Sequence, residues 1–181
     1  MTSGTDNTGI EGEKIMNLEI EKKFLITGIP GDVDSYRHYE IEQGYICTSP
    51  TVRIRKRDNE YFLTVKSKPV NGIKPSETLI NDEYEINISK EAYEHLLQKV
   101  DSTPLSKTRY LVPLDGGLTA EVDVFRGRLS GLQFAEVEFP TAEAAEHFKK
   151  PSWFVKDVSS DKRYRNSYLA GLKEYNEEEF L

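Results

Sequence analysis

The sequence predicts an α+β protein, mainly β, in which eight antiparallel strands close into a barrel with helices on its outside. Short segments in which charged and apolar side chains alternate indicate strands, and Gly, Asp, Asn or Pro residues separate most of them. Only three segments show the spacing of an amphipathic helix. The 181 residues are enough for one domain with a buried core that needs no disulfides.

Eight segments have the alternating pattern of a strand. They are 17–26, 40–48, 51–57, 60–68, 78–88, 105–113, 117–126 and 132–139. The turn signals between them include Ser49-Pro50, Asp58-Asn59, Asn71-Gly72 and Asp115-Gly116-Gly117.

Three helices are expected, each after a residue that can cap its first turn. They are 90–100 after Ser89, 142–149 after Thr141, and 162–174 after Ser160 or Asp161. Residues 1–16 are rich in Gly, Ser, Thr and Asn and show no apolar period, so we interpret them as a flexible leader. No linker divides the rest, and residues 17–181 are expected to form one barrel domain that includes the C-terminal helix.

Composition excludes several classes of protein. No apolar run approaches about 18 residues, so no membrane span is expected. The N-terminus lacks a basic start followed by an apolar stretch, so we expect no signal peptide and a soluble, cytoplasmic protein. Cys47 is the single cysteine and the three histidines are scattered, so any bound metal would need oxygen ligands.

Charges of like sign share one face of most strands. Since side chains alternate along a strand, residues two apart point the same way. Eight acids and eight bases occupy these faces: Glu19, Glu21, Glu83, Glu85, Glu121, Asp123, Glu136 and Glu138, and Lys23, Arg53, Arg55, Arg57, Lys66, Lys68, Lys107 and Arg109. Like charges at that spacing repel unless opposite charge lies between them.

Ordinary amphipathic strands, with a wet charged face over an apolar core, would explain any one of these segments. Across seven strands that explanation weakens, because a solvated face normally intersperses signs and uses Ser, Thr, Asn and Gln. We therefore expect the charged faces to turn inward around a water-filled tunnel, with helices over the outer apolar faces. Eight strands suffice to close a barrel around a small ligand.

Carboxylates without Cys or His clusters favour Mg²⁺ or Mn²⁺, and Arg matches phosphate oxygens with two hydrogen bonds. Together the two clusters indicate a metal–phosphate complex. Lys162 and Arg163 open the last predicted helix, where cations are unfavourable unless an anion lies nearby. A salt bridge to Asp157 or Asp161 is the equal alternative. Nucleic acid is not expected as a partner, since nothing indicates a contiguous basic surface and no phosphate-binding glycine loop is present.

The segment EIEKK at 19–23 resembles the ExExK signature of the CYTH domain, the triphosphate tunnel metalloenzyme superfamily. The resemblance covers about 17–172. It includes TVRIRKR at 51–57, YFLTVKSK at 61–68, EYEI at 83–86, KTRY at 107–110, EVDVF at 121–125, AEVEF at 135–139 and DKRYRNSYLA at 161–170. It implies an eight-stranded tunnel barrel that acts on triphosphates with Mg²⁺ or Mn²⁺.

Residue roles follow from that resemblance. It implies a metal site of Glu19, Glu21, Asp123, Glu136 and Glu138, with Glu83, Glu85 and Glu121 as further inward acids. It implies a phosphate cradle of Lys23, Arg53, Arg55, Arg57, Lys66 and Arg109, to which we add Lys162 and Arg163. Lys107 resembles the lysine beside the scissile phosphate, Tyr45 a proposed proton acceptor, and Lys66 is assigned a catalytic role as well.

Several reactions occur in this family. A His-Phe pair typical of class IV adenylate cyclases is missing before Glu19, whereas DKRYRNSYLA and the preceding Trp153-Phe154 are similar to short bacterial inorganic triphosphatases. Hydrolysis of inorganic tripolyphosphate to pyrophosphate and phosphate is therefore expected first, nucleoside (ATP) or thiamine triphosphate hydrolysis second, and cyclisation third. A binding module without turnover is the non-enzymatic alternative. Uncovered apolar faces would also allow two copies to pair as a homodimer.

Overall fold

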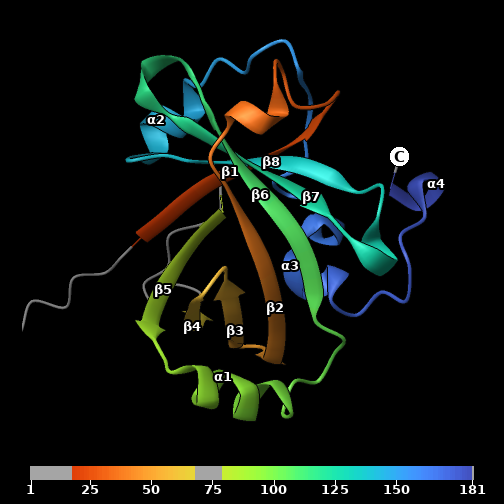
Figure 1. Cartoon of the computed structure of the whole chain (residues 1–181). Coiled ribbons are helices and arrows are strands. Elements are labelled where there is room, and N and C mark those ends of the chain that lie inside the picture. Colours follow the sequence, from red (N-terminus) through yellow and green to blue (C-terminus); the bar gives the residue numbers. More distant parts are fainter. Residues whose placement is uncertain (1–17, 68–78, 181) are drawn as a thin grey trace, which may run out of the picture.

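The computed structural model describes residues 18–67 and 79–180 (Figure 1). For residues 18, 19, 67 and 79–82 it describes the backbone but not the side chain. The predicted leader, Lys68 and the predicted turn at Asn71-Gly72 lie outside the described residues. Within the described part of the chain, no helix combines the length and the apolar character that a membrane crossing requires.

Strands dominate the described chain. They are β1 (Leu18–Ile26), β2 (His38–Thr48), β3 (Thr51–Arg57), β4 (Glu60–Ser67), β5 (Leu79–Asn87), β6 (Leu105–Pro113), β7 (Thr119–Phe125), β8 (Gln133–Glu138) and β9 (Phe154–Asp157). The helices are α1 (Lys90–Leu97), α2 (Ala142–Glu146), α3 (Asn166–Leu169) and α4 (Glu177–Phe180), with 3-10 turns at Val33–Ser35, Asp115–Gly117, Gly127–Leu129 and Lys162–Tyr164. The predicted class, mainly β with few helices, is confirmed.

All strands belong to one antiparallel sheet with the order β5-β4-β3-β2-β6-β7-β8-β1-β9. The predicted closed barrel of eight strands is therefore wrong in this form, because β9 adds a ninth strand. Residues Phe154–Asp157 are too few for an alternating pattern to stand out in the sequence. In addition, β1 pairs with β5 over Leu18–Glu21. Strands β5 and β9 therefore lie along one edge of β1, and β8 pairs with its other edge.

Two of the three predicted helices are confirmed near their predicted starts. The hydroxyl groups of Ser89 and Thr141 accept hydrogen bonds from the third residue after each, as helix caps do. The helix predicted over 162–174 is wrong. The chain there forms the 3-10 turn Lys162–Tyr164 and then the short helix α3, with Arg165 in an extended conformation between them. This break allows both Tyr164 and Leu169 to be buried in one apolar cluster.

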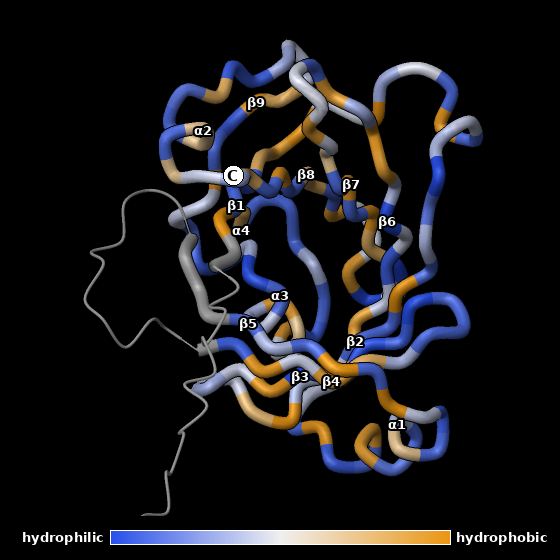
Figure 2. Tube along the Cα trace, turned by 90° about the vertical axis from the view of Figure 1, so that its left-hand side faces the viewer, coloured by the Kyte–Doolittle hydropathy of each residue, from blue (hydrophilic) through white to orange (hydrophobic). Residues whose placement is uncertain are grey.

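Hydrophobic and hydrophilic positions alternate along the strands (Figure 2). One set of apolar residues packs under α2 and β9; it includes Ile20, Val122 and Val137. The charged residues predicted to share a face point the opposite way. Helix α1 lies over β3 and β4, outside the face that carries the charges (Figure 1).

Gly44 on β2 lies where the chain after α1 approaches the sheet. A Cβ atom at this position would be 2.7 Å from Cγ1 of Val100 and 3.3 Å from its Cβ. Because a β-branched valine has little freedom to move, we expect Gly44→Ala to lower the free energy of unfolding by about 1–3 kcal/mol. Urea denaturation measures this change. The Gly44→Ala, Val100→Ala double variant should recover part of the loss, and an unchanged midpoint for Gly44→Ala alone would contradict the clash.

Candidate functional site

Charged residues of the sheet gather on one face, which we call the concave face. It carries Lys23, Arg53, Arg55, Lys66, Glu83, Glu85, Lys107, Arg109, Glu121, Asp123 and Glu136. Several are almost inaccessible to solvent: Asp123 is 0% and Lys107 2% exposed. The prediction that these charges turn inward holds for Lys23, Arg53, Lys107, Asp123 and Glu136, which are buried, whereas Glu85 and Glu138 are exposed.

Ion pairs on this face join strands that are not neighbours. Nη2 of Arg109 on β6 lies 2.5 Å from Oε2 of Glu136 on β8, and β7 runs between these strands. Likewise, Arg53 on β3 reaches Glu83 on β5 across β4, at 3.5 Å. Side chains from alternate strands meet in this way where a sheet curves toward them. The charged face is therefore the concave one.

Arg109 is the centre of the acidic half of this face. Its Nε donates to Asp123 Oδ1 at 2.6 Å and its Nη2 to Asp123 Oδ2 at 2.7 Å, while Nη1 donates to Glu121. Burial lowers the pKa of Arg109, but three carboxylates outweigh that effect and hold it well above its usual value. Lys107 also donates to Asp123. Burial and the charge of Arg109 nevertheless lower the pKa of Lys107 to about 8.

Lys23 is fixed by the C-terminal part of the chain as well as by the sheet. Its Nζ lies 2.7 Å from Oε1 of Glu136 and donates to the carbonyl oxygen of Tyr164 at 3.2 Å. Burial lowers the pKa of Lys23, but the negative charges of Glu136 and Glu21 outweigh it and the pKa is raised. Burial raises the pKa of Glu136, but Lys23 and Arg109 hold it well below its usual value.

A second group of bases lies on β3 and β4. Arg55 donates to both carboxylate oxygens of Glu85, at 2.8 and 2.7 Å, and Lys66 lies 2.7 Å from Glu83. The Nε of Arg55 is buried without a hydrogen-bond partner, so this guanidinium keeps a donor for another acceptor. Burial and the neighbouring Arg53 lower the pKa of Arg55, which is the sign of crowded positive charge.

Glu21, Glu121 and Glu138 form an acidic cluster near one end of the concave face. Burial raises the pKa of Glu138, and the negative charges of Glu121 and Glu21 raise it further. Glu21 and Glu138 have no ion pair among the described residues, whereas Asp123 and Glu136 are paired with bases. The side chain of Glu19 lies outside the described part.

No group of three Asp, Glu, His or Cys side chains among the described residues is spaced to hold a metal ion. The chemistry of the acidic cluster nevertheless fits a hard divalent cation, because three carboxylates meet there and Arg109, which pairs with Glu121, only partly offsets their repulsion at Glu138.

Tyr45 is buried on the same face as the bases, where its hydroxyl accepts a hydrogen bond of 2.9 Å from Gln43. Burial raises the pKa of Tyr45, although Arg53 and Lys66 oppose this. A phenol with a raised pKa is protonated at neutral pH, so the environment does not favour Tyr45 as a proton acceptor. That role stays a prediction.

Three other predicted phosphate ligands lie away from the paired charges. Arg57 is near the rim, 31% exposed, where it pairs with Glu60 and lies over the rings of Tyr39 and Phe62. Arg163 donates from Nε to Oδ1 and from Nη2 to Oδ2 of Asp161, which is the salt bridge predicted as the alternative for it. Lys162 is exposed.

Arg165, the next basic residue of DKRYRNSYLA, is not among the predicted site residues. It directly follows Tyr164, whose carbonyl group contacts Lys23, and its Nε is buried with no hydrogen-bond partner. A continuous helix over 162–174 would place Lys162 and Arg163 in its first turn, whereas the observed chain breaks at Arg165.

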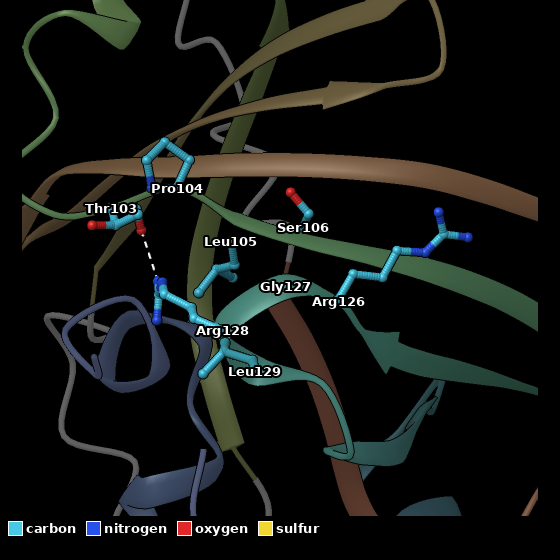
Figure 3. Close-up of a pocket in the computed structure, with 8 residues that line it drawn as sticks. All are labelled: Thr103, Pro104, Leu105, Ser106, Arg126, Gly127, Arg128 and Leu129. Atoms are coloured by element: carbon cyan, nitrogen blue, oxygen red, sulfur yellow. Dashed lines mark hydrogen bonds between the residues drawn. The ribbon is translucent and has the colours of Figure 1, made fainter. Parts of the chain in front are cut away.

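A separate pocket of about 410 Å³ lies between the loop before β6 and the turn after β7 (Figure 3). Its lining contains none of the predicted site residues: Thr103, Pro104, Leu105, Ser106, Arg126, Gly127, Arg128 and Leu129. Arg128 donates there to the carbonyl oxygens of Thr103, Leu169 and Leu172, which ties the C-terminal segment to the sheet. The interactions of Arg128 identify it as a structural residue.

The sequence of this chain was compared with protein families and with known proteins. Residues 17–167 match the CYTH domain. An inorganic triphosphatase of Nitrosomonas europaea is 41% identical over 157 residues, which cover 84% of this chain and 96% of that protein. An inorganic triphosphatase of Acetivibrio thermocellus is 37% identical over 160 residues, covering 85% and 94% of the two chains.

The crystal structure of the inorganic triphosphatase NE1496 is similar to this fold. The TM-score is 0.63 at 36% identity, with 87% of this chain and 97% of that chain covered. The family match spans all the described strands and with them the whole concave face. The chain therefore belongs to the CYTH domain family.

Proposed function

We propose that this protein hydrolyses triphosphates, with inorganic tripolyphosphate as the preferred substrate. The observation that carries the proposal is the concave face itself, where buried lysines and arginines meet buried carboxylates. Charges of this kind are costly to bury for stability alone. They are useful where a compact polyanion binds, since arginine and lysine complement phosphate oxygens. The names of the two bacterial relatives support the same reaction.

The sheet would curl into a channel through the β1–β5 pairing, and the bases would line it. In this proposal Lys23, Arg53, Arg55, Lys66 and Arg109 hold the phosphate chain. Because these side chains are already ion-paired with Glu83, Glu85, Asp123 and Glu136, they are pre-organised before substrate binds. Arg165 is a further ligand through its unpaired Nε.

Glu21 and Glu138, with Glu19, would hold a divalent cation, either Mg²⁺ or Mn²⁺. When bound, such an ion neutralises charge on the phosphate chain and orients the attacking water. Asp123 and Glu136 instead keep Lys107, Arg109 and Lys23 in place.

In the reaction the oxygen of water bonds to a terminal phosphorus and the bond to the bridging oxygen breaks. Pyrophosphate leaves with the bond's electron pair, orthophosphate forms, and the proton of the water passes to solvent. Lys107, charged below its pKa of about 8, stabilises the charge that develops on the phosphate oxygens.

Tripolyphosphate, ATP and thiamine triphosphate, each with Mg²⁺ and then Mn²⁺, test the proposal. We expect orthophosphate release to be fastest from tripolyphosphate. Release from none of the three with either metal would refute hydrolysis. Cyclic AMP formed from ATP would identify the cyclase alternative, and tight binding without turnover would identify a binding module.

We predict that Glu138→Gln raises the Mg²⁺ or Mn²⁺ concentration needed for half-maximal rate by about tenfold or more, because the acidic cluster loses one charged ligand. Metal titration at saturating tripolyphosphate measures it. Glu146→Gln, an exposed residue of α2, is the matched control. An unchanged metal requirement in Glu138→Gln would remove this residue from the proposed metal site.

Two further expectations belong to the same proposal. Tyr84 and Ile86 on the outer side of β5 are exposed apolar residues, and they are where two copies would pair as a homodimer. A cytoplasmic location stays a prediction.

A further inference from the structure

A short polar side chain lies between charged residues of the concave face where β3, β4 and β5 run side by side (Figure 1). Thr64 on β4 is paired with Arg53 on β3 and with Glu85 on β5, so the three residues form one row across neighbouring strands. Thr64 belongs to the concave face because it is two residues from Lys66 on the same strand. It is 0% exposed, so its hydroxyl group must find its partners within the protein.

The hydroxyl group of Thr64 is both an acceptor and a donor. It accepts a hydrogen bond of 3.2 Å from Nη2 of Arg53 and donates one of 2.8 Å to Oε2 of Glu85. Donation to a carboxylate polarises the hydroxyl oxygen and makes it a better acceptor for the guanidinium group. The same carboxylate oxygen also accepts a hydrogen bond of 2.7 Å from Nη2 of Arg55. Thr64 therefore connects Arg53 to the ion pair of Arg55 and Glu85.

The carboxylate of Glu85 affects the positions of both guanidinium groups. Arg55 donates to both of its oxygens, whereas Nη2 of Arg53 lies 3.8 Å from Oε2. Burial and the charge of Arg53 lower the pKa of Arg55, and the charge of Glu85 opposes them. Since a β-branched side chain has few rotamers, the hydroxyl group of Thr64 holds this carboxylate in one orientation. Arg53 then stays on the hydroxyl group and does not compete with Arg55 for the carboxylate.

We propose that Thr64 is a positioning residue for phosphate binding, which keeps the guanidinium groups of Arg53 and Arg55 in separate places on the concave face. The inference rests on the proposed function and adds an uncharged residue to it. Thr64 acts through Glu85 and Arg53 and does not itself contact the phosphate chain. Its effect is on the geometry of the site before substrate binds, which determines how well two arginines meet the same polyanion.

Thr64→Val in the full chain tests this, because valine is branched in the same way and lacks the hydroxyl group. We expect the KM for tripolyphosphate to rise by about tenfold, since one hydrogen bond to a charged group is lost on each side of Thr64. The kcat should change less than the KM, because Lys107 and its partners are untouched. Thr64→Ser should keep the KM within about threefold of the native value, since serine has the same donor and acceptor. Thermal unfolding verifies that each variant is folded.

Thr108→Val is the matched control. Thr108 is 2% exposed, and it also donates to a glutamate that is paired with an arginine: Glu40 accepts at 3.1 Å from its hydroxyl group and at 3.0 Å from Arg126. However, Thr108 lies next to Lys107 on β6 and so belongs to the opposite face of the sheet. Its substitution should leave the KM unchanged, although it also removes a hydrogen bond of a buried hydroxyl group.

The Glu85→Gln background gives a second readout. If Thr64 acts through this carboxylate, Thr64→Val raises the KM by a smaller factor there than in the native protein. The same factor in both backgrounds, a native KM in Thr64→Val, or equal effects of Thr64→Val and Thr108→Val would each overturn the inference.

The proposed function fails separately, if tripolyphosphate releases no phosphate with either metal. Calorimetric titration of the same variants with tripolyphosphate then decides the inference, since it requires binding and no turnover. We expect the Kd to rise in Thr64→Val and to stay near the native value in Thr64→Ser and Thr108→Val. No binding to the native protein, or a native Kd in Thr64→Val, would refute the role of Thr64.

Discussion

Replacing Arg109 by alanine is expected to lower the free energy of unfolding by about 3–5 kcal/mol. This guanidinium contacts Glu121, Asp123 and Glu136, and two of these carboxylates are buried. Its removal leaves buried negative charge without enough compensation, a cost that neither solvent nor relaxation readily relieves. Urea denaturation monitored by circular dichroism measures the change.

Arg126→Ala is the matched control for Arg109. Arg126 forms an ion pair of 3.0 Å with Glu40, but both side chains are more than half exposed. Pairs of this kind contribute about 0–1 kcal/mol. Equal shifts of the unfolding midpoint in Arg109→Ala and Arg126→Ala would show that the buried ion pairs of the concave face stabilise the fold no more than an exposed pair does. Arg109→Lys should restore only part of the stability, because an ammonium group cannot contact three carboxylates at once.

Lys107→Met is expected to reduce turnover of tripolyphosphate by about 100-fold or more, within the range seen when one donor to developing charge is removed. Methionine keeps the volume of the side chain, and Asp123 keeps its two hydrogen bonds from Arg109. The fold should therefore survive, while the charge that we propose to lie beside the reacting phosphate is lost. Phosphate release at saturating substrate gives the rate, and thermal unfolding verifies that the protein is folded.

Lys90→Met provides the comparison for Lys107. Lys90 lies on α1, where it pairs with Glu94 in an exposed position at 3.5 Å. Its substitution should leave turnover within about twofold of the native rate, since surface pairs of this kind contribute little. A folded Lys107→Met variant with native turnover would show that Lys107 has a structural role only.

Much of the fold was predictable because strand periodicity is local. Arg53, Arg55 and Arg57 share a face through their spacing alone, and the helix caps Ser89 and Thr141 need only the next three residues. The 3-10 turn at Lys162–Tyr164 was not predictable in this way. It forms where Tyr164 is buried against Phe134 and Phe180. Both residues lie more than ten positions away along the chain, so a local pattern around Tyr164 does not include them.

The sequence predicts which charged residues share the concave face better than it predicts which acid pairs with which base. Glu136 and Asp123 were expected as metal ligands from resemblance, yet both carboxylates face bases on other strands. Which acid pairs with which base depends on strand register and on the curvature of the sheet. Both depend on several strands together, so the sequence of one strand does not determine them. Arg165, which we propose as a further phosphate ligand, could not be predicted for the same reason, since it lies at the break in the predicted helix.

The sequence by itself determined that acids and bases segregate by strand on one face, because alternation fixes side-chain direction within each strand. Only the tertiary structure decided that this face is concave, that its acids split into a paired set and an unpaired set, and that Thr64 connects charged residues of neighbouring strands. These features depend on contacts between segments distant along the chain, where packing and charge neutralisation are satisfied together.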